Sequence, residues 1–177
     1  MKRHAAGSVV VILLAVLAFT LTAGCKRDRR PVVFKEGDAG PSFTLPALDG
    51  KPVDLASFRG KVVMVHFWAT WCPPCVEEIP TLQKLYTALP GTDFAVLAVS
   101  VDEGGAPAVG AFMRQKGLTL PMLLNPDRSV ASSYGTFKFP ETYILDRQGI
   151  IRYKIIGAAD WSRPEPMNAI KELIARK

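Results

Sequence analysis

Two cysteines separated by two residues constrain this chain more than any other feature of its sequence. Residues 71–75 read Trp-Cys-Pro-Pro-Cys, so Cys72 and Cys75 can close a small disulfide ring and open it again. The apolar run at 62–67 before them predicts a buried strand. After them, apolar residues recur at helical spacing: Val76, Ile79, Leu82, Leu85 and Leu89. The pair is therefore expected where a strand ends and a helix begins.

The start of a helix favours redox chemistry at a cysteine. The first turn presents unpaired backbone N–H groups and a partial positive charge. Because both stabilise a thiolate, a cysteine placed there becomes a nucleophile near neutral pH. This spacing, between a strand and a helix, indicates a redox-active pair rather than a structural bridge.

The net charge of +6 comes from the N-terminus. Without Lys2, Arg3 and residues 26–30, the chain has 16 basic and 15 acidic residues. We therefore expect no nucleic-acid partner, because the excess charge does not lie on the folded domain. A chain of 177 residues is long enough for one domain with its own apolar core.

The first 24 residues have the features of a targeting segment. A basic start is followed by a largely apolar stretch of 13 residues at 9–21, too short for a spanning helix. The sequence Leu-Thr-Ala-Gly-Cys at 21–25 resembles a bacterial lipobox, which implies that Cys25 carries a lipid. We predict a lipoprotein-type signal peptide at 1–24, a lipidated cysteine and flexible tether at 25–40, and a catalytic domain at 41–177. An uncleaved membrane anchor and a secreted form are the alternatives, and each places the domain outside the cytoplasm.

The rest of the chain predicts an α/β fold with a mixed central sheet flanked by helices. A hairpin around Asp49-Gly50 comes first. A strand at 94–101 should run parallel to the strand at 62–67, joined by a helix that Pro80 would kink. Further strands are expected at 120–124, 139–146 and 150–156, the last two antiparallel. Helices are expected up to Gly117, at 127–134, and after a capping box formed by Ser162 and Glu165, with Met167, Ile170 and Ile174 on the buried face.

These motifs resemble a known family. Residues 67–75 (Phe-Trp-Ala-Thr-Trp-Cys-Pro-Pro-Cys), the Phe139-Pro140 step that opens a strand, and the closing hairpin and helix look like a thioredoxin-fold protein. The leader at 43–51 and the helix inserted between Val101 and Leu120 resemble the exported TlpA/ResA/DsbE branch. Residues 139–146 with 149–153 are close to its cytochrome c-maturation members. The resemblance covers about residues 37–174.

The resemblance assigns roles to residues around the pair. It implies that Cys72 is the exposed attacking thiol, that Cys75 is the buried resolving thiol, and that Pro140 is a cis proline facing them. A cis bond is plausible there because cis peptides are essentially confined to X-Pro bonds. Trp71 is expected to pack over the disulfide. Trp71, Phe139 and Pro140 would then form the substrate-binding wall.

Two further residues could move a proton. Thioredoxin has a buried aspartate at the position of His66, so that role is vacant or changed here. Glu78 matches an acidic residue that the branch places near its thiols. We expect Glu78 to tune proton transfer to or from Cys75; the alternative is a solvated glutamate favoured by the helix dipole. His66 is expected to be a satisfied strand histidine rather than a catalyst.

The resulting prediction is a membrane-tethered, extracytoplasmic thiol–disulfide oxidoreductase that needs no cofactor and no metal. Its partners would be exported cysteine-containing proteins, with apocytochrome c the first candidate, and a membrane electron donor. A peroxiredoxin-like thiol peroxidase is an alternative, although its cysteine does not normally lie in Trp-Cys-x-x-Cys. A metal-delivery module is the other alternative, and two cysteines supply only half of a zinc or copper site.

Overall fold

The computed structural model describes residues 34–176. A mixed five-stranded sheet with the order β5-β4-β3-β6-β7 forms its centre. β3 (Val62–Trp68) pairs in parallel with β4 (Phe94–Ser100), which pairs in parallel with β5 (Met122–Leu124). On the other side, β3 pairs antiparallel with β6 (Glu141–Leu145), and β6 with β7 (Ile151–Ile156). All seven residues of β3 are buried, as expected for the central strand of a sheet covered on both faces.

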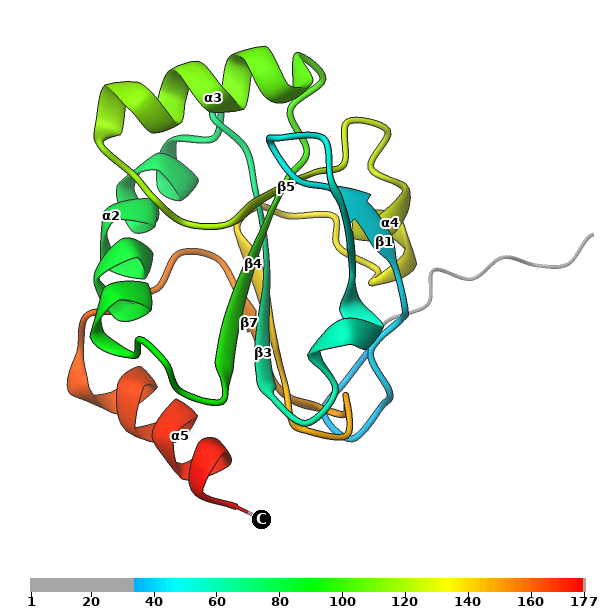
Figure 1. The fold of residues 1–177 in the computed structure, drawn as a ribbon, viewed down its shortest axis with the longest axis vertical. Helices are drawn as coiled ribbons and strands as arrows, with labels where there is room; N and C mark the ends of the chain where they lie inside the picture. The colour runs from blue at the N-terminus through cyan, green and yellow to red at the C-terminus, as the bar shows by residue number, and fades with distance from the viewer. Residues whose placement is uncertain (1–33, 177) are drawn as a thin grey trace, which may run out of the picture. The chain divides into compact units, whose positions relative to one another are not determined.

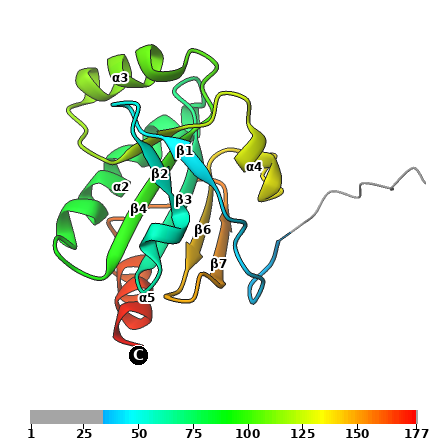
Figure 2. The same ribbon diagram turned by 45° about the vertical axis from the view of Figure 1, so that its right-hand side comes forward.

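Helices and the leader cover the sheet. α2 (Pro73–Ala88) and α5 (Pro164–Ala175) lie on the same side of the sheet in both ribbon views (Figures 1 and 2). α3 (Gly105–Lys116) lies over one end of the sheet, where Phe112 packs on Trp68 at the end of β3 (Figure 1). The short α4 (Ser129–Ser133) and the hairpin lie on the other side. The last residues of β3 therefore lie at an end of the sheet that α3 partly covers.

The predicted hairpin is present before the main sheet. β1 (Thr44–Pro46) pairs antiparallel with β2 (Pro52–Asp54), and a 3-10 turn, η1 (Leu55–Phe58), follows. Gly50 has a φ of 80°, the left-handed conformation that the Asp-Gly turn requires. The hairpin is joined to the edge of the main sheet by a bridge between Ala47 and Leu123. The fold is thus the expected thioredoxin-like one, with the hairpin extension and the inserted helix α3.

The capping box predicted at Ser162 and Glu165 is wrong. α5 starts at Pro164, its N-cap is Arg163, and no side chain caps it. The residue before a proline is pushed into extended backbone, and Arg163 has φ −75° and ψ 155°. The helix therefore starts one residue later than the box requires, and the Ser162 hydroxyl donates to Asp160 instead.

The buried face of α5 differs slightly from the prediction. Ile170 is fully buried, and Leu173 is the other buried residue of the helix. Met167 and Ile174 are only partly buried against the core. Pro80 lies inside α2, which runs without interruption from Pro73 to Ala88.

Candidate active site

The two cysteines form a disulfide at the junction of β3 and α2. Their Cα atoms are 5.3 Å apart. Cys72 is the N-cap of α2 in extended backbone, whereas Cys75 lies in the first turn, on the face that carries Ile79 and Leu82 into the core. Cys72 retains 5% exposure and Cys75 has none. Any partner that reaches this pair from solvent therefore meets Cys72 first.

The two prolines between the cysteines reduce the number of backbone donors near the sulfur atoms. Pro73 and Pro74 occupy the first helical positions, where a missing N–H costs least. The N–H of Cys75 is then the first one that α2 can present, and the N–H of Val76 already donates to the Cys72 carbonyl at 3.1 Å.

Asp102 anchors the loop that carries the motif, and sequence reasoning missed it. Each of its carboxylate oxygens accepts the Thr70 N–H at 3.1 Å, and one accepts the Thr70 hydroxyl at 2.5 Å. The other accepts the Ser100 hydroxyl at 2.6 Å. Asp102 is 3% exposed, so these bonds replace the water that the carboxylate loses. The residues just before Trp71 are thus fixed to the end of β4.

The Phe139–Pro140 step faces the disulfide. Its peptide bond is cis, and the Phe139 carbonyl oxygen lies 3.5 Å from Sγ of Cys72. The Pro140 carbonyl accepts the Gly157 N–H at 2.9 Å, which ties this step to the end of β7. The backbone before Pro140 therefore lies next to the accessible sulfur.

Trp71 contacts the residue that precedes the cis proline. Its ring meets that of Phe139 edge to face, with centroids 6.1 Å apart and planes at 85°. It remains 55% exposed. The structure therefore brings Trp71, Cys72, Phe139 and Pro140 together, and leaves the indole of Trp71 available to a partner.

Glu78 is a buried carboxyl on α2, not a solvated one. It is 3% exposed, whereas the neighbouring Glu77 is exposed. One oxygen, Oε1, accepts the indole N–H of Trp161 and the backbone N–H of Ala159, the latter at 3.3 Å. Oε2 is buried without a hydrogen-bond partner among the described residues. Loss of solvent raises the pKa of Glu78 to about 7, although the two hydrogen bonds oppose this rise.

Comparison with known proteins agrees with this geometry. The family model described as "AhpC/TSA family" matches residues 37–154. The chain belongs to this family. It is 33% identical over 149 residues to a thiol-disulfide oxidoreductase ResA of Geobacillus thermodenitrificans, covering 84% of each chain. A second ResA, of Oceanobacillus iheyensis, is 33% identical over 162 residues, covering 89% of this chain and 83% of the relative.

A solved structure supports the same assignment. A thiol:disulfide interchange protein of the thioredoxin family from Chlorobium tepidum superposes with a TM-score of 0.67 at 27% identity, covering 81% of this chain and all of that one (100%). With the Cys72–Cys75 disulfide, these similarities identify a thioredoxin-fold thiol–disulfide oxidoreductase of the ResA/DsbE type.

His66 of this oxidoreductase is a buried, neutral strand histidine. Its Nδ1 lies 2.9 Å from the Thr142 hydroxyl on the neighbouring strand β6. Burial lowers the pKa of His66 to about 3, so the ring stays uncharged at physiological pH. A group of such low basicity is a poor proton acceptor near neutral pH.

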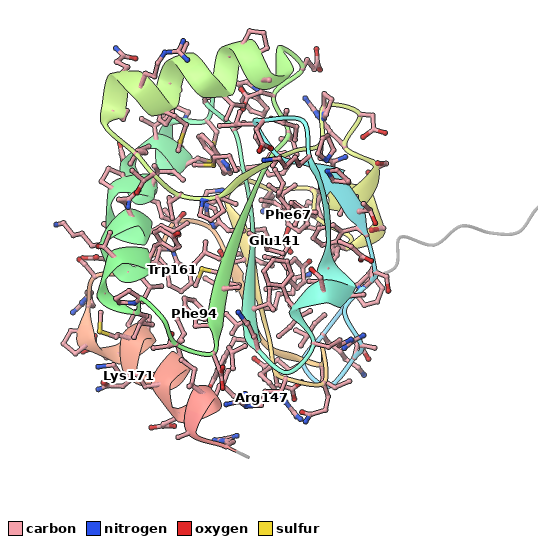
Figure 3. All side chains as sticks on the ribbon, in the orientation of Figure 1. Phe67, Phe94, Glu141, Arg147, Trp161 and Lys171 are labelled. Carbon is pink, nitrogen blue, oxygen red and sulfur yellow. A yellow bond between two sulfur atoms is a disulfide. The ribbon has the colours of Figure 1, made fainter. Side chains whose placement is uncertain are left out.

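A second buried carboxylate lies directly after Pro140, and no local sequence pattern predicts its partners. Glu141 has no exposed surface, and its Oε1 accepts from Lys154 Nζ at 3.0 Å and from the Tyr143 hydroxyl at 2.8 Å. Burial alone would lower the pKa of Lys154, but its bonds to Tyr143 and Glu141 raise it. This ion pair joins β6 to β7 behind the Phe139–Pro140 step. Figure 3 labels Glu141 within the sheet and Trp161 beside α2.

The remaining expectations concern metal and membrane. Among residues 34–176, no three His, Cys, Asp or Glu side chains are grouped closely enough to hold a metal ion. The same part of the chain has no helix that is long and apolar enough to cross a membrane. Cys25 and the predicted signal peptide lie outside the described residues.

The raised pKa of Glu78 predicts how stability depends on pH. Between pH 4.5 and about 7 the folded protein keeps this proton while the unfolded chain releases it. The free energy of unfolding therefore falls as the pH rises through this window, and the loss is complete above it. We expect wild-type protein to lose about 3 kcal/mol relative to Glu78→Gln between pH 4.5 and pH 8.

Urea denaturation of the oxidised proteins at a series of pH values measures this difference. Glu77→Gln is the matched control, because it removes an exposed carboxylate one residue away and should follow the wild type. Parallel curves for wild type and Glu78→Gln would contradict a raised pKa at this position.

Proposed function

We propose that this oxidoreductase is tethered to a membrane outside the cytoplasm and reduces disulfides of exported proteins, with apocytochrome c the first candidate. The observation that carries the proposal is the Cys72–Cys75 pair, of which only Cys72 is accessible, facing the backbone before Pro140. An extended substrate segment could pair with that backbone and bring its own sulfur to Cys72.

The reaction transfers two electrons through sulfur. In the reduced enzyme the Cys72 thiolate attacks one sulfur of a substrate disulfide, forming a mixed disulfide and releasing the other substrate sulfur as a thiolate, which takes up a proton. Cys75 then loses its proton and attacks Sγ of Cys72. The Cys72–Cys75 disulfide forms, the second substrate thiolate leaves and is protonated, and the substrate ends as a dithiol. A membrane dithiol donor restores the enzyme by the reverse exchange.

Glu78 is the proton partner of Cys75 in this scheme. The two residues are three apart on α2, a spacing that puts them on one face of the helix. Cys75 has no exposed surface and must release its proton without direct contact with solvent. A carboxyl with a pKa of about 7, one of whose oxygens has no partner in the described part of the chain, is suited to accept a proton near neutral pH.

The N-terminal sequence supports the location. The basic start, the apolar run at 9–21 and the lipobox-like sequence before Cys25 are those of an exported lipoprotein. In an oxidising compartment a reductase needs electrons from across the membrane. The near-neutral charge of residues 31–177 argues against a nucleic-acid partner.

Cys75→Ser should trap the substrate. Without the resolving thiol, the mixed disulfide on Cys72 cannot be released, so exported cysteine-containing proteins should be recovered covalently bound from the native host. Non-reducing electrophoresis and mass spectrometry identify them, and Cys72→Ser is the control that should trap none.

Recovery of no partner on Cys75→Ser would contradict a protein-disulfide substrate. Turnover of peroxide without a protein partner would favour the peroxidase alternative. A stoichiometric, tightly held metal in the purified protein would favour metal delivery.

The role of Glu78 predicts a change in the pH–rate profile. The rate at which Cys75 resolves a mixed disulfide should rise through an inflection near pH 7 in the wild type, because Glu78 must be ionised to accept the proton. Glu78→Gln should lose this inflection, and Glu77→Gln should keep it. Stopped-flow release of a chromophoric thiol measures the rate, and an unchanged profile in Glu78→Gln would end this assignment.

A further inference from the structure

The exposed large hydrophobic side chains of the described residues lie on segments that carry the redox pair or the cis-proline step, or that pair with the latter. Within residues 34–176 they are Phe137 at 68%, Trp71 at 55% and Ile156 at 54% exposure. Trp71 precedes Cys72, Phe137 lies two residues before Phe139, and Ile156 is the register partner of Glu141, the residue after Pro140. Large exposed apolar side chains next to a reactive site favour contact with a partner.

Two cations lie on these aromatic rings. The Arg128 guanidinium is 5.7 Å from the centroid of the Trp71 ring, and Lys138 Nζ is 5.9 Å from that of Phe137. Both distances are within the range of a cation–π contact. We call Trp71, Phe137, Phe139, Arg128 and Lys138 the aromatic–basic rim of the site.

Arg128 has a backbone conformation that disfavours its side chain. Its φ is 57°, and it is the one described non-glycine residue with positive φ. This left-handed conformation suits glycine and is unfavourable for a residue with a Cβ. Such an outlier at the edge of a redox site supports a functional role for the side chain it carries.

The loop around Arg128 holds it in this conformation. The Arg128 N–H donates to the Asn125 carbonyl at 3.0 Å, and the Asn125 amide donates to Asp127 at 2.6 Å. The Asn125 side-chain oxygen accepts the Ala131 N–H at 3.1 Å, and Asp127 accepts from the Ser129 N–H and hydroxyl. These bonds fix the backbone from which the Arg128 guanidinium reaches over the Trp71 ring.

The charge on Arg128 is only partly neutralised. Its ion pair with Glu103 is 3.3 Å long, and the two side chains are 45% and 81% exposed. Exposed pairs of this kind contribute little, and a guanidinium has five N–H donors, so a second carboxylate can bind. Glu77, the exposed carboxylate on α2, lies two residues after Cys75 and so points to the opposite side of that helix.

We propose that Arg128 and Lys138 select substrate segments that carry an acidic side chain and an apolar side chain beside the reacting cysteine. The apolar side chain would pack on Trp71 and Phe137, and the carboxylate would bind the two cations. This inference rests on the proposed thiol–disulfide exchange at Cys72 and adds the chemical class of the segment that Cys72 attacks. Arg128 is then a specificity-determining residue.

The test uses cysteine peptides in which the cysteine forms a mixed disulfide with a chromophoric thiol. Each peptide contains a Cys-Leu pair, in which the leucine is the apolar side chain. The peptides differ only at the position next to this pair, which holds Glu, Gln or Lys. The full-length reduced protein in neutral detergent attacks each peptide, and release of the chromophore gives the rate constant.

At low ionic strength the Glu peptide should react about tenfold faster than the Lys peptide, with the Gln peptide between them. The ratio should fall toward one in high salt, since exposed charges are screened. Arg128→Gly should cut the ratio severalfold while retaining the loop, because glycine accepts a φ of 57°. Arg128→Glu should favour the Lys peptide, and Lys138→Glu should weaken the preference independently.

Lys171→Glu is the matched control. It makes the same charge change on the exposed face of α5, and Figure 3 shows it on that helix. Three residues after Lys171, the Ile174 carbonyl accepts a hydrogen bond from Arg147, which also donates to the carbonyl of Gly60, just before β3. Because Cys72 follows the other end of β3, this part of α5 lies at the opposite end of the sheet from Cys72. Its peptide ratio should equal that of the wild type.

Equal rates for the Glu and Lys peptides in the wild type, or an unchanged ratio in both Arg128→Gly and Lys138→Glu, would overturn the selectivity. Failure of all three peptides to react would instead contradict the exchange chemistry of the proposed function, and this inference with it.

Discussion

The different burial of the two sulfur atoms is the constraint on which the site depends. Helical periodicity puts Cys75 on the inner face of α2 with Ile79 and Leu82, so that the core which stabilises the fold also shields this sulfur. Cys72 is also largely buried but keeps 5% exposure, since it is the N-cap, at the end of the helix rather than on its face. Packing therefore leaves Cys72 the more accessible of the two sulfur atoms.

In the proposed mechanism, Glu78 accepts the proton that the buried Cys75 thiol must release. A thiol without solvent contact needs an internal acceptor before it can attack. Glu78 is on the same helix face and is itself desolvated, which is why its pKa lies near neutrality rather than near 4.5. Trp161 and Ala159 hold one of its oxygens, and the other has no partner within residues 34–176. His66 cannot substitute, since burial makes it a very weak base.

Local sequence patterns predicted most of the fold and the centre of the site. The apolar run of β3, the Asp-Gly turn and the Cys-Pro-Pro-Cys spacing each have a short-range physical meaning, and the structure has these elements where they were expected. Contacts between distant segments were not predictable. Asp102 meets Thr70 across 32 positions and Trp161 meets Glu78 across 83, and no local pattern specifies such pairs.

The predicted capping box failed for a different reason. Its spacing was correct, but Pro164 imposed extended backbone on Arg163 and moved the helix start. Arg128 was also missed, because a left-handed arginine is unusual and only the three-dimensional structure shows its guanidinium over Trp71. In each case the competing constraint lay in the backbone conformation of one residue rather than in the hydrophobic pattern.

Selective alkylation most directly tests the central claim, which is that the fold leaves the Cys72 thiol accessible and buries the Cys75 thiol. The reduced, folded protein is treated with one equivalent of iodoacetamide per redox-active pair, and the label is mapped to peptides so that Cys25 is counted separately. We expect Cys72 to be labelled and Cys75 not, and both to react once the protein is unfolded in urea. Comparable labelling of the two cysteines in the folded protein, or faster labelling of Cys75, would contradict it.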